Sequence, residues 1–284
     1  MARPAGRQGP AGARARVRPE VRPLTSSTPD ALWASRSVRT LKPAAVVCEG
    51  VTRRLRGQQL LDDLTMVVGV GARLLVVSRP EQSASMLLRV LAGLSRMRSG
   101  TVRLAGLARP DSSPAGWARR VGYVGPEAGI YPWMTPREVL DLAGRIAEYD
   151  PSEIRRRIDR VAELHRFGAS LDQPIRRGGE PLAQRVAFAS AMLTDPEVLL
   201  LDEPLRAVDA EERARLLTIP GRRRTVVIAS RYPASEGGLV NQVAFLRDGR
   251  LALHASVEEL ERRGLALSQR GIDALIEISA AEAG

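Results

Sequence analysis

The sequence predicts an α/β fold with a parallel β-sheet, and two observations support that prediction. Short apolar runs alternate with segments whose leucines recur at helical spacing, which is the pattern of helices that connect parallel strands. One apolar run, at 197–204, has the sequence EVLLLDEP and passes directly into two carboxylates. A buried strand that ends in two acids brings negative charge to one edge of the sheet, so we expect a site there.

The first half of the expected domain is rich in strands. The expected strands lie at 46–50, 60–70, 73–77, 101–107 and 121–124. A polar turn is expected at 53–58. After the strand at 73–77 the pattern changes to that of a helix at 81–94, where Leu87 and Leu91 recur at helical spacing. The chain therefore passes from a strand through a loop into a helix.

The second half is predicted to contain mainly helices, with further strands between them. Residues 135–166 have a helical pattern with a break at Asp150, which is expected to be the N-cap residue before Pro151 at the first helical position. The elements expected after it are a helix at 183–193, the acidic strand, a helix at 210–217, a strand at 225–229 and a hairpin at 243–253. The hairpin is expected to turn at Asp248 and Gly249.

The formal net charge of +11 is concentrated near the start of the chain. Residues 1–43 contain nine basic and two acidic residues, a net charge of +7. Pro, Gly, Ala and Arg dominate the beginning of this segment without apolar periodicity, which predicts a disordered basic tail. We expect the folded domain at 44–262 and a C-terminal helical extension at 263–284.

The sequence shows no segment that is expected to enter a bilayer. No apolar run approaches the roughly 18 residues of a membrane-spanning helix, and the first residues lack the apolar stretch of a secretion signal. We therefore expect a cytosolic chain. The single cysteine, Cys48, cannot form an internal disulfide and is expected as a buried thiol in a strand. The two histidines, His165 and His254, are expected to be structural or exposed.

A series of short motifs in a fixed order resembles a known family. They are LLDDL at 60–64, GARLLVV at 71–77, LLRVLAG at 87–93, SGTV at 99–102, VGYV at 121–124, YPWMT at 131–135, QRVA at 184–187, the acidic strand and LRDGR at 246–250. With these motifs the sequence resembles the ATP-binding cassette (ABC) family of transporter ATPases over residues 45–262. The resemblance implies a P-loop NTPase core of the RecA-like type, an antiparallel β subdomain and an α-helical insert at 127–182. It also implies ATP and Mg²⁺ as ligands.

The phosphate-binding loop of that family, GxxxxGK[ST], corresponds to residues 78–85, and here it departs from the pattern. Ser78 and Ser83 occupy the two glycine positions, and Ala84 occupies the lysine position. Serine disfavours the positive φ that glycine adopts freely, and alanine supplies no charge for the outer phosphates. Only Ser85 remains, as the hydroxyl expected to bind Mg²⁺.

Neighbouring residues of the loop are expected to weaken phosphate binding further. Pro80 removes an amide donor, and Glu81 places negative charge near a polyphosphate. Met86, which follows the loop, completes the expected cofactor-binding residues of this segment. Two interpretations stay open: weak nucleotide binding, since a helix N-terminus still attracts anions, or a strand-to-helix turn that binds nothing. A separate possibility is that Arg79 folds back and replaces the missing lysine charge.

The resemblance assigns four more positions, and each departs from the family's residue. Pro126 stands where a Mg-sensing glutamine is expected, and Arg231 stands where a histidine is expected. Leu55 stands where an aromatic ring usually stacks on adenine. In the signature segment, which seals the partner's ATP with a serine and two glycines, the ungapped alignment gives Gly179 followed by a glutamate and a proline. A shifted alignment uses 177–179 instead and restores two glycines without the serine.

The metal side of the site keeps the family's residues. Ser85 and Asp202 are expected to bind Mg²⁺, and Glu203 occupies the position of the general base. Asp209, further along the chain, is expected to contribute to the nucleotide site. The sequence thus predicts a metal-side half site without its phosphate-side half.

We therefore predict an ATP-binding cassette subunit of a bacterial ABC transporter that hydrolyses ATP slowly or not at all and that couples to or regulates a membrane permease. It is expected at the inner face of the cell membrane, as a homodimer or as a heterodimer with another cassette. Residues 131–133, beside the helical insert, are the expected permease contacts, although these aromatics could equally belong to a local core.

Two alternatives stay open. One is a pseudo-ATPase that acts as an interaction or nucleic-acid-associated module through the basic tail at 1–43. Nucleic acid is not the expected partner, because cassette proteins that act on it usually contain two cassettes or large inserts. The other alternative is a working ATPase in which Arg79 replaces the lysine charge.

Overall fold

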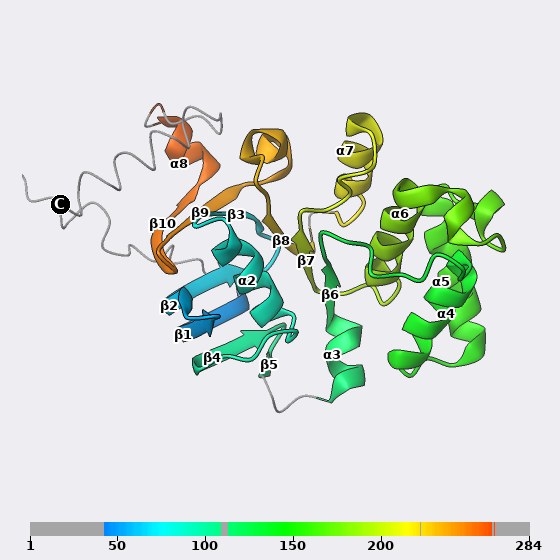
Figure 1. Cartoon of the computed structure of the whole chain (residues 1–284), viewed down its shortest axis with the longest axis horizontal. Coiled ribbons are helices and arrows are strands. Elements are labelled where there is room, and N and C mark those ends of the chain that lie inside the picture. Colours follow the sequence, from blue (N-terminus) through cyan, green and yellow to red (C-terminus); the bar gives the residue numbers. More distant parts are fainter. Residues whose placement is uncertain (1–42, 109–112, 222, 263, 265–284) are drawn as a thin grey trace, which may run out of the picture.

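The computed structural model describes residues 43–108, 113–221, 223–262 and 264. Apart from Pro43 and Gly264, the predicted basic tail and the predicted C-terminal extension lie outside these residues. The described chain forms two β-sheets and a group of helices beside them (Figure 1). One sheet has the strand order β2-β1-β4-β5, and the other has the order β10-β9-β3-β8-β7-β6.

The four-stranded sheet is antiparallel. Its strands are β1 (Ala44–Leu55), β2 (Gln58–Gly69), β4 (Ser99–Leu104) and β5 (Leu107–Ala108). The predicted turn at 53–58 is too long, because Leu55 already pairs with Gln58 across the hairpin. Only Arg56 and Gly57 form the turn, both with positive φ, as a tight two-residue hairpin turn requires. The polar side chains in this segment therefore mark an exposed strand end rather than a loop.

The six-stranded sheet contains the expected parallel strands. They are β3 (Arg73–Arg79), β6 (Val121–Val124), β7 (Val198–Asp202), β8 (Thr225–Ala229) and β9 (Gln242–Arg247), with β10 (Arg250–Ser256) antiparallel at the edge. Every residue of β7 and β8 is buried. A strand that is covered on both faces is mostly apolar, which explains the apolar runs at 198–201 and 226–229, while the buried polar residues Asp202 and Thr225 lie at strand ends.

Helix α2 (Gln82–Leu91) directly follows β3 and joins the two sheets through one core. Its residues Leu87, Leu88 and Leu91 are fully buried against strands of both sheets. The helix ends three residues earlier than predicted, because the chain reverses at Gly93, which has φ of +79°. Helix α2 is therefore anchored by its apolar face in the core that both sheets share.

Six further α-helices lie in the described part of the chain. They are α3 (Pro114–Arg120), α4 (Pro136–Ile146), α5 (Pro151–Leu164), α6 (Gly179–Met192), α7 (Ala210–Thr218) and α8 (Val257–Arg262). Of these, α4 to α6 are grouped together. Short 3₁₀ segments lie at Gly168–Ser170, Ile175–Arg177 and Pro233–Leu239. The sequence analysis did not predict α3, although Ser113 caps it through the amide of Gly116 and Pro114 is its first residue. Within the described residues, no helix has the length and apolar character that crossing a membrane requires.

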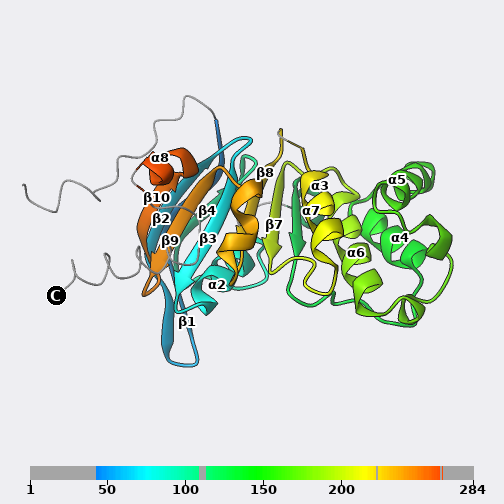
Figure 2. The same cartoon turned by 90° about the horizontal axis from the view of Figure 1, so that it is seen from above.

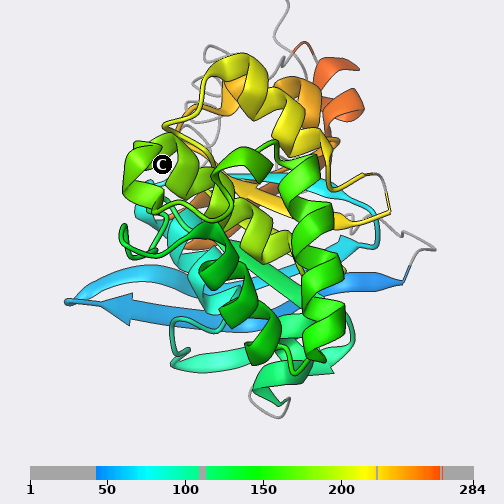
Figure 3. The same cartoon turned by 90° about the vertical axis from the view of Figure 1, so that its right-hand side faces the viewer.

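Helices α4, α5 and α6 form a separate helical subdomain. Figures 1 and 2 both place it beyond β6 and β7, at the opposite end of the molecule from β1 and β2. Viewed from its own side in Figure 3, it lies in front of both sheets. The predicted break at Asp150 is confirmed as the N-cap position of α5, but the Asp150 side chain makes no capping hydrogen bond. Pro151 at the first helical position is what favours the start there.

His165, just after α5, is fully buried in this part of the molecule. Its ring centroid lies 5.4 Å from that of Phe188 and 6.3 Å from that of Phe167. Neither ring nitrogen has a hydrogen-bond partner among the described residues. Burial, helped by the positive charges of Arg215 and Arg185, lowers the pKa of His165 to about 4. The imidazole is therefore neutral in the folded protein at pH 7.

We expect the free energy of unfolding to fall by about 3 kcal/mol more in the native chain than in a His165→Leu variant as pH is lowered from 7.5 to 4. The unfolded chain gains a proton on His165 near its usual pKa of about 6.5, whereas the folded chain resists protonation until about pH 4. The contribution is therefore complete above the unfolded pKa and is lost as pH falls through this window. Urea titrations at each pH measure it.

His254→Leu is the comparison variant, since it leaves His165 in place and should retain the His165 contribution to this pH dependence. Burial lowers the pKa of His254 as well, so this variant removes only the separate contribution of His254. Parallel pH profiles for the native chain and His165→Leu would contradict the assignment.

Candidate functional site

The predicted polar residues meet at the carboxyl edge of the parallel sheet. In the register of β7 and β8, Asp202 pairs with Ala229, so that Arg231 follows at the same edge. Val76 of β3 also pairs with Ala229, which brings the loop after β3 to this edge. The sheet alone thus brings together three chain segments that are far apart in the sequence.

Ser85 and Asp202 are in direct contact, as their expected metal role requires. The Ser85 hydroxyl donates to Oδ1 of Asp202 at 2.7 Å, and the Tyr123 hydroxyl donates to Oδ2 at 3.3 Å. Burial raises the pKa of the Asp202 carboxyl, and the hydrogen bonds from Ser85 and Tyr123 oppose that rise. A hydroxyl and a carboxylate are oxygen ligands of the kind that Mg²⁺ accepts, with water and phosphate oxygens in its other positions. These two residues therefore fit the metal.

No group of three or more His, Cys, Asp or Glu side chains among the described residues is arranged to hold a metal ion. The Ser85–Asp202 pair would therefore hold Mg²⁺ only together with oxygens from a nucleotide or water. Tyr123 was missed by the sequence analysis, because its place beside Asp202 follows from the pairing of β6 with β7. Its position at the end of a short strand was the available signal.

The turn between β3 and α2 is closed by Ser78, which lies near the end of β3. The Ser78 hydroxyl accepts the amide of Ala84 at 2.9 Å, and it lies within donating distance of the carbonyls of Pro80 at 2.9 Å and Glu81 at 3.0 Å. In the family's pattern, Ala84 stands at the lysine, whose amide faces the phosphates. Here that amide already has a partner inside the protein. The metal side of the site thus fits Mg²⁺, whereas the phosphate side does not fit a polyphosphate.

Of the other residues around this turn, some are buried in the core, whereas Arg79 is exposed to solvent. Ser83, Ala84 and Met86 are buried, and the latter two belong to the core that α2 joins. Met86 could therefore meet a ligand only through its backbone. Arg79 is exposed and forms no ion pair with a described residue. Its side chain is available for an anion but projects from the strand end rather than from the start of α2.

Glu203 is held by Arg231. Its Oε1 accepts the backbone amide of Arg231 at 2.7 Å and the Nε of the same residue at 3.3 Å. Glu203 has φ of +50°, a conformation that L-residues adopt rarely and that is concentrated at functional sites. The turn after β7 thus directs the carboxylate back toward the end of β8. One of the two oxygens of the expected general base is occupied by two donors.

Four predicted residues lie outside this cluster. Pro126 is exposed beyond β6, and Leu55 is 41% exposed at the end of β1. Gly179 begins α6 in the helical subdomain with φ of +63°. Asp209 is the N-cap of α7, where its side chain accepts the amide of Glu212 at 2.9 Å. Their nucleotide roles stay predictions from the resemblance.

Gln184 links the signature segment to the loop after β7. Its Nε2 donates to Glu180 in the first turn of α6 at 3.1 Å, and its Oε1 accepts the amide of Ala207 at 2.9 Å. The residue is buried. From the sequence, Gln184 is recognised only as part of a motif, since its second partner is distant in the sequence.

Comparison with known proteins decides the family. The family model for ABC transporters matches residues 62–206, which is half of the chain. The chain belongs to the ABC transporter family. The predicted fold class is confirmed as well, because an ATP-binding subunit of an ABC transporter superimposes with a TM-score of 0.71 at 20% identity, over 83% of this chain and 99% of that one. An ATP-binding cassette bound to ADP and Pi superimposes with a TM-score of 0.64 at 16% identity, over 74% and 98%.

Relatives in this ABC family are named as import ATP-binding proteins. The sn-glycerol-3-phosphate import ATP-binding protein of Paracoccus denitrificans is 31% identical over 61% of this chain and 48% of its own length. The Fe(3+) ions import ATP-binding protein of Streptomyces coelicolor is 32% identical over 78% and 65%. The aliphatic sulfonates import ATP-binding protein of Bacillus subtilis is 30% identical over 73% and 78%. The chain spans about half the length of the first of these relatives.

Replacing Ser78 by alanine should lower the free energy of unfolding by about 1–2 kcal/mol. The change leaves the buried amide of Ala84 without its acceptor and removes the donor to the loop carbonyls. Urea unfolding with an unchanged m-value measures the loss. Ser152→Ala, at an exposed position of α5, is the control and should stay within about 0.5 kcal/mol of the native chain. Equal stability of the two variants would show that the Ser78 contacts do not hold the loop.

Proposed function

We propose that this chain is the ATP-binding subunit of an ABC importer, with weak nucleotide binding and little or no ATP hydrolysis of its own, and that it couples to or regulates a membrane permease. The observation that best supports the proposal is the Ser78 hydroxyl on the amide of Ala84. At this position the protein supplies the acceptor that a phosphate would otherwise supply, and the lysine charge is absent. Family membership and the names of the relatives support the transporter assignment.

Ser85 and Asp202 would hold Mg²⁺, which neutralises the charge that develops on the β- and γ-phosphates. The chain keeps this metal pair but offers the phosphates little positive charge of its own. Glu81, at the N-cap of α2, is exposed and opposes a polyphosphate at the start of that helix. Arg79 is the one arginine of the loop and is the residue to test as a substitute for lysine.

Slow hydrolysis is inferred from the Glu203–Arg231 contact. A general base needs a free oxygen within reach of the attacking water. Arg231 donates twice to Oε1 of Glu203, which leaves only Oε2 for an attacking water, and a guanidinium cannot accept a proton from water or return one. The carboxylate is thus partly engaged with Arg231, and the position of the family's histidine offers no proton acceptor.

Pairing with a second cassette follows from the resemblance. In such a pair the loop at 78–85 of one chain would face the segment at 179–181 of the other. Glu180 and Pro181 lie in the first turn of α6, so that segment would present a carboxylate and one amide fewer to the phosphates. A homodimer would have both defects at each site, whereas a heterodimer with an intact cassette would divide them between two sites.

The permease contact is proposed at the exposed aromatic pair before α4. Tyr131 and Trp133 are 61% and 62% exposed, and their rings stack with centroids 4.6 Å apart. Neither ring belongs to a described core, so the alternative of a local core loses support. This position would place the chain at the inner face of the membrane through its partner.

Restoring the family loop should tighten binding of a fluorescent ATP analogue with Mg²⁺ at least tenfold, about 1.4 kcal/mol. The test variant is Ser78→Gly/Ser83→Gly/Ala84→Lys, and the control is the same variant with Ala84→Met, which adds the bulk without the charge. Fluorescence titration measures both Kd values. Micromolar binding by the native chain that is lost in Arg79→Ala would instead favour the alternative in which Arg79 replaces lysine.

Turnover of the purified native chain should lie far below the roughly 10 s⁻¹ typical of enzymes, and Glu203→Gln should leave it unchanged. The reason is that Glu203 is already held by Arg231. Phosphate release at saturating Mg-ATP measures the rate. A native rate near the typical value that collapses in Glu203→Gln would overturn the non-hydrolysing assignment.

A further inference from the structure

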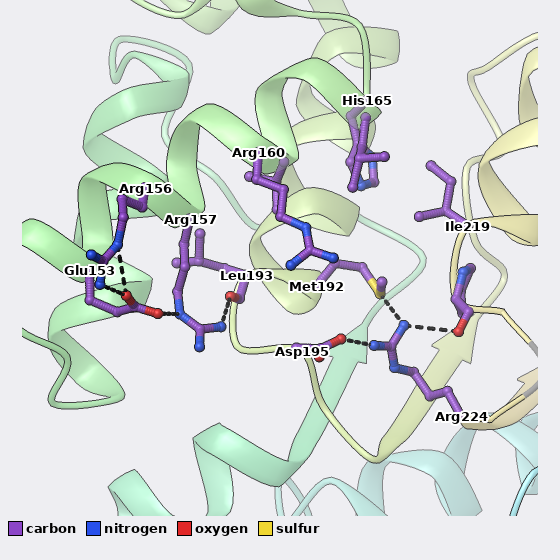
Figure 4. A pocket seen from close by; sticks show the side chains of 13 residues that line it. Glu153, Arg156, Arg157, Arg160, His165, Met192, Leu193, Asp195, Ile219 and Arg224 are labelled. Atoms are coloured by element: carbon purple, nitrogen blue, oxygen red, sulfur yellow. Dashed lines mark hydrogen bonds and ion pairs between the residues drawn. The ribbon is translucent and has the colours of Figure 1, made fainter.

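A polar pocket lies at the edge of the parallel sheet opposite the nucleotide edge. It has a volume of about 490 Å³ and is formed by α5, the end of α6 and the segments just before β7 and β8 (Figure 4). Asp195 precedes β7 and Arg224 precedes β8. The nucleotide edge lies at the other end of these five-residue strands, roughly 16 Å away. The pocket is therefore separate from the site described above.

The charge of this pocket is mainly positive. Its lining contains four arginines and two carboxylates. Glu153 pairs with both Arg156 and Arg157. Asp195 pairs with Arg224, although the Asp195 side chain is 68% exposed. The positive charge in the pocket thus exceeds the negative charge.

Two of the guanidinium groups are fixed by neutral partners. Arg157 donates to the carbonyl of Leu193 at 2.8 Å and lies 4.3 Å from the ring centroid of Tyr149. Arg224 donates to the carbonyls of Pro196 and Pro220 and has a largely buried side chain. Donors that are held in place before a ligand arrives lose little conformational freedom on binding.

Arg160 is the cation without a counterion. It forms no ion pair or hydrogen bond with a described residue, and its guanidinium points into the pocket near Arg224 in Figure 4. The two like charges act on each other, since the charge of Arg160 contributes to the lowered pKa of Arg224, after the larger effect of burial. Asp195 thus pairs with Arg224 alone, and Arg160 has no carboxylate partner among the described residues.

His165 supplies a second, independent observation. It lines the same pocket, is fully buried, and has no partner for either ring nitrogen among the described residues. A buried donor without an acceptor costs stability, and a neutral imidazole always has one N–H to donate. The pocket wall therefore contains a buried polar group whose hydrogen-bonding capacity the described residues leave unsatisfied.

We propose that this pocket binds a small phosphate-bearing anion, with its oxygens between Arg160 and Arg224. Planar guanidinium groups match the oxygen geometry of phosphate, and the bound anion would replace the exposed Asp195 carboxylate as the partner of Arg224. The volume lies within the range of small-molecule pockets, about 300–1,000 Å³, and leaves room for a substituent on the phosphate. The ligand is inorganic phosphate or a small phosphate monoester.

Isothermal titration calorimetry on the full chain tests this site, with sodium phosphate as the probe and sodium chloride of equal ionic strength as the blank. The native chain should bind phosphate saturably, and Arg160→Ala should weaken binding at least tenfold. Arg155→Ala is the matched control, because it removes an exposed arginine of the same helix that does not line the pocket. Unchanged binding in this control is expected.

The same titration with methyl phosphate distinguishes the two sources. Tighter binding of the ester assigns the pocket to a phosphate monoester, and tighter binding of inorganic phosphate assigns it to the free ion. Absence of saturable binding would overturn the proposal. Binding that survives Arg160→Ala but is lost in Ser85→Ala would place the ion at the nucleotide edge and would overturn it as well. Arg160→Gln keeps much of the length of the side chain but removes its charge. It should weaken phosphate binding as much as Arg160→Ala does, which excludes lost side-chain packing as the cause of the weaker binding.

Discussion

The nucleotide edge depends on the parallel register of β3, β8 and β7, in which Ala229 is paired on one side with Val76 and on the other with Asp202. Because the carboxyl ends of parallel strands share an edge, this register determines that the loop after β3 faces the acids after β7. Helix α2, which follows this loop, is packed in a core shared with both sheets and so anchors the end of the loop. A shift of one residue between β7 and β8 would turn Asp202 to the other face of the sheet and separate it from Ser85.

The polar groups of this edge use each other as partners. Ser78 binds the amide of Ala84, Ser85 binds Asp202, and Arg231 binds Glu203. An incoming nucleotide must therefore exchange protein contacts for its own, and the gain from each new hydrogen bond is reduced by the bond it replaces. In a glycine-rich loop with a lysine, the same amides would have no competing side-chain acceptor at the position of Ser78. The serine thus changes both the shape of the loop and the energy of occupying it.

Much of the fold could be predicted from the sequence, because the buried strands are mostly apolar and the leucines of α2 follow a helical period. The errors arose where pairing or capping outweighs local composition, as in the hairpin turn at Arg56 and Gly57 and in the unpredicted helix α3. At the site, Ser85 and Asp202 were predicted together and are in contact. Tyr123 and the second partner of Gln184 could not be predicted, since both depend on contacts between segments that are distant in the sequence.

The contact between Gln184 and Ala207 has a mechanical consequence. Gln184 belongs to α6 of the helical subdomain, whereas Ala207 belongs to the loop that connects β7 with α7 in the sheet core. The buried amide side chain of Gln184 links the helical subdomain to the sheet core. Any rocking of the helical subdomain must either break this hydrogen bond or move the loop that begins at Glu203, so that the position of the helical subdomain and the position of the acidic turn are coupled.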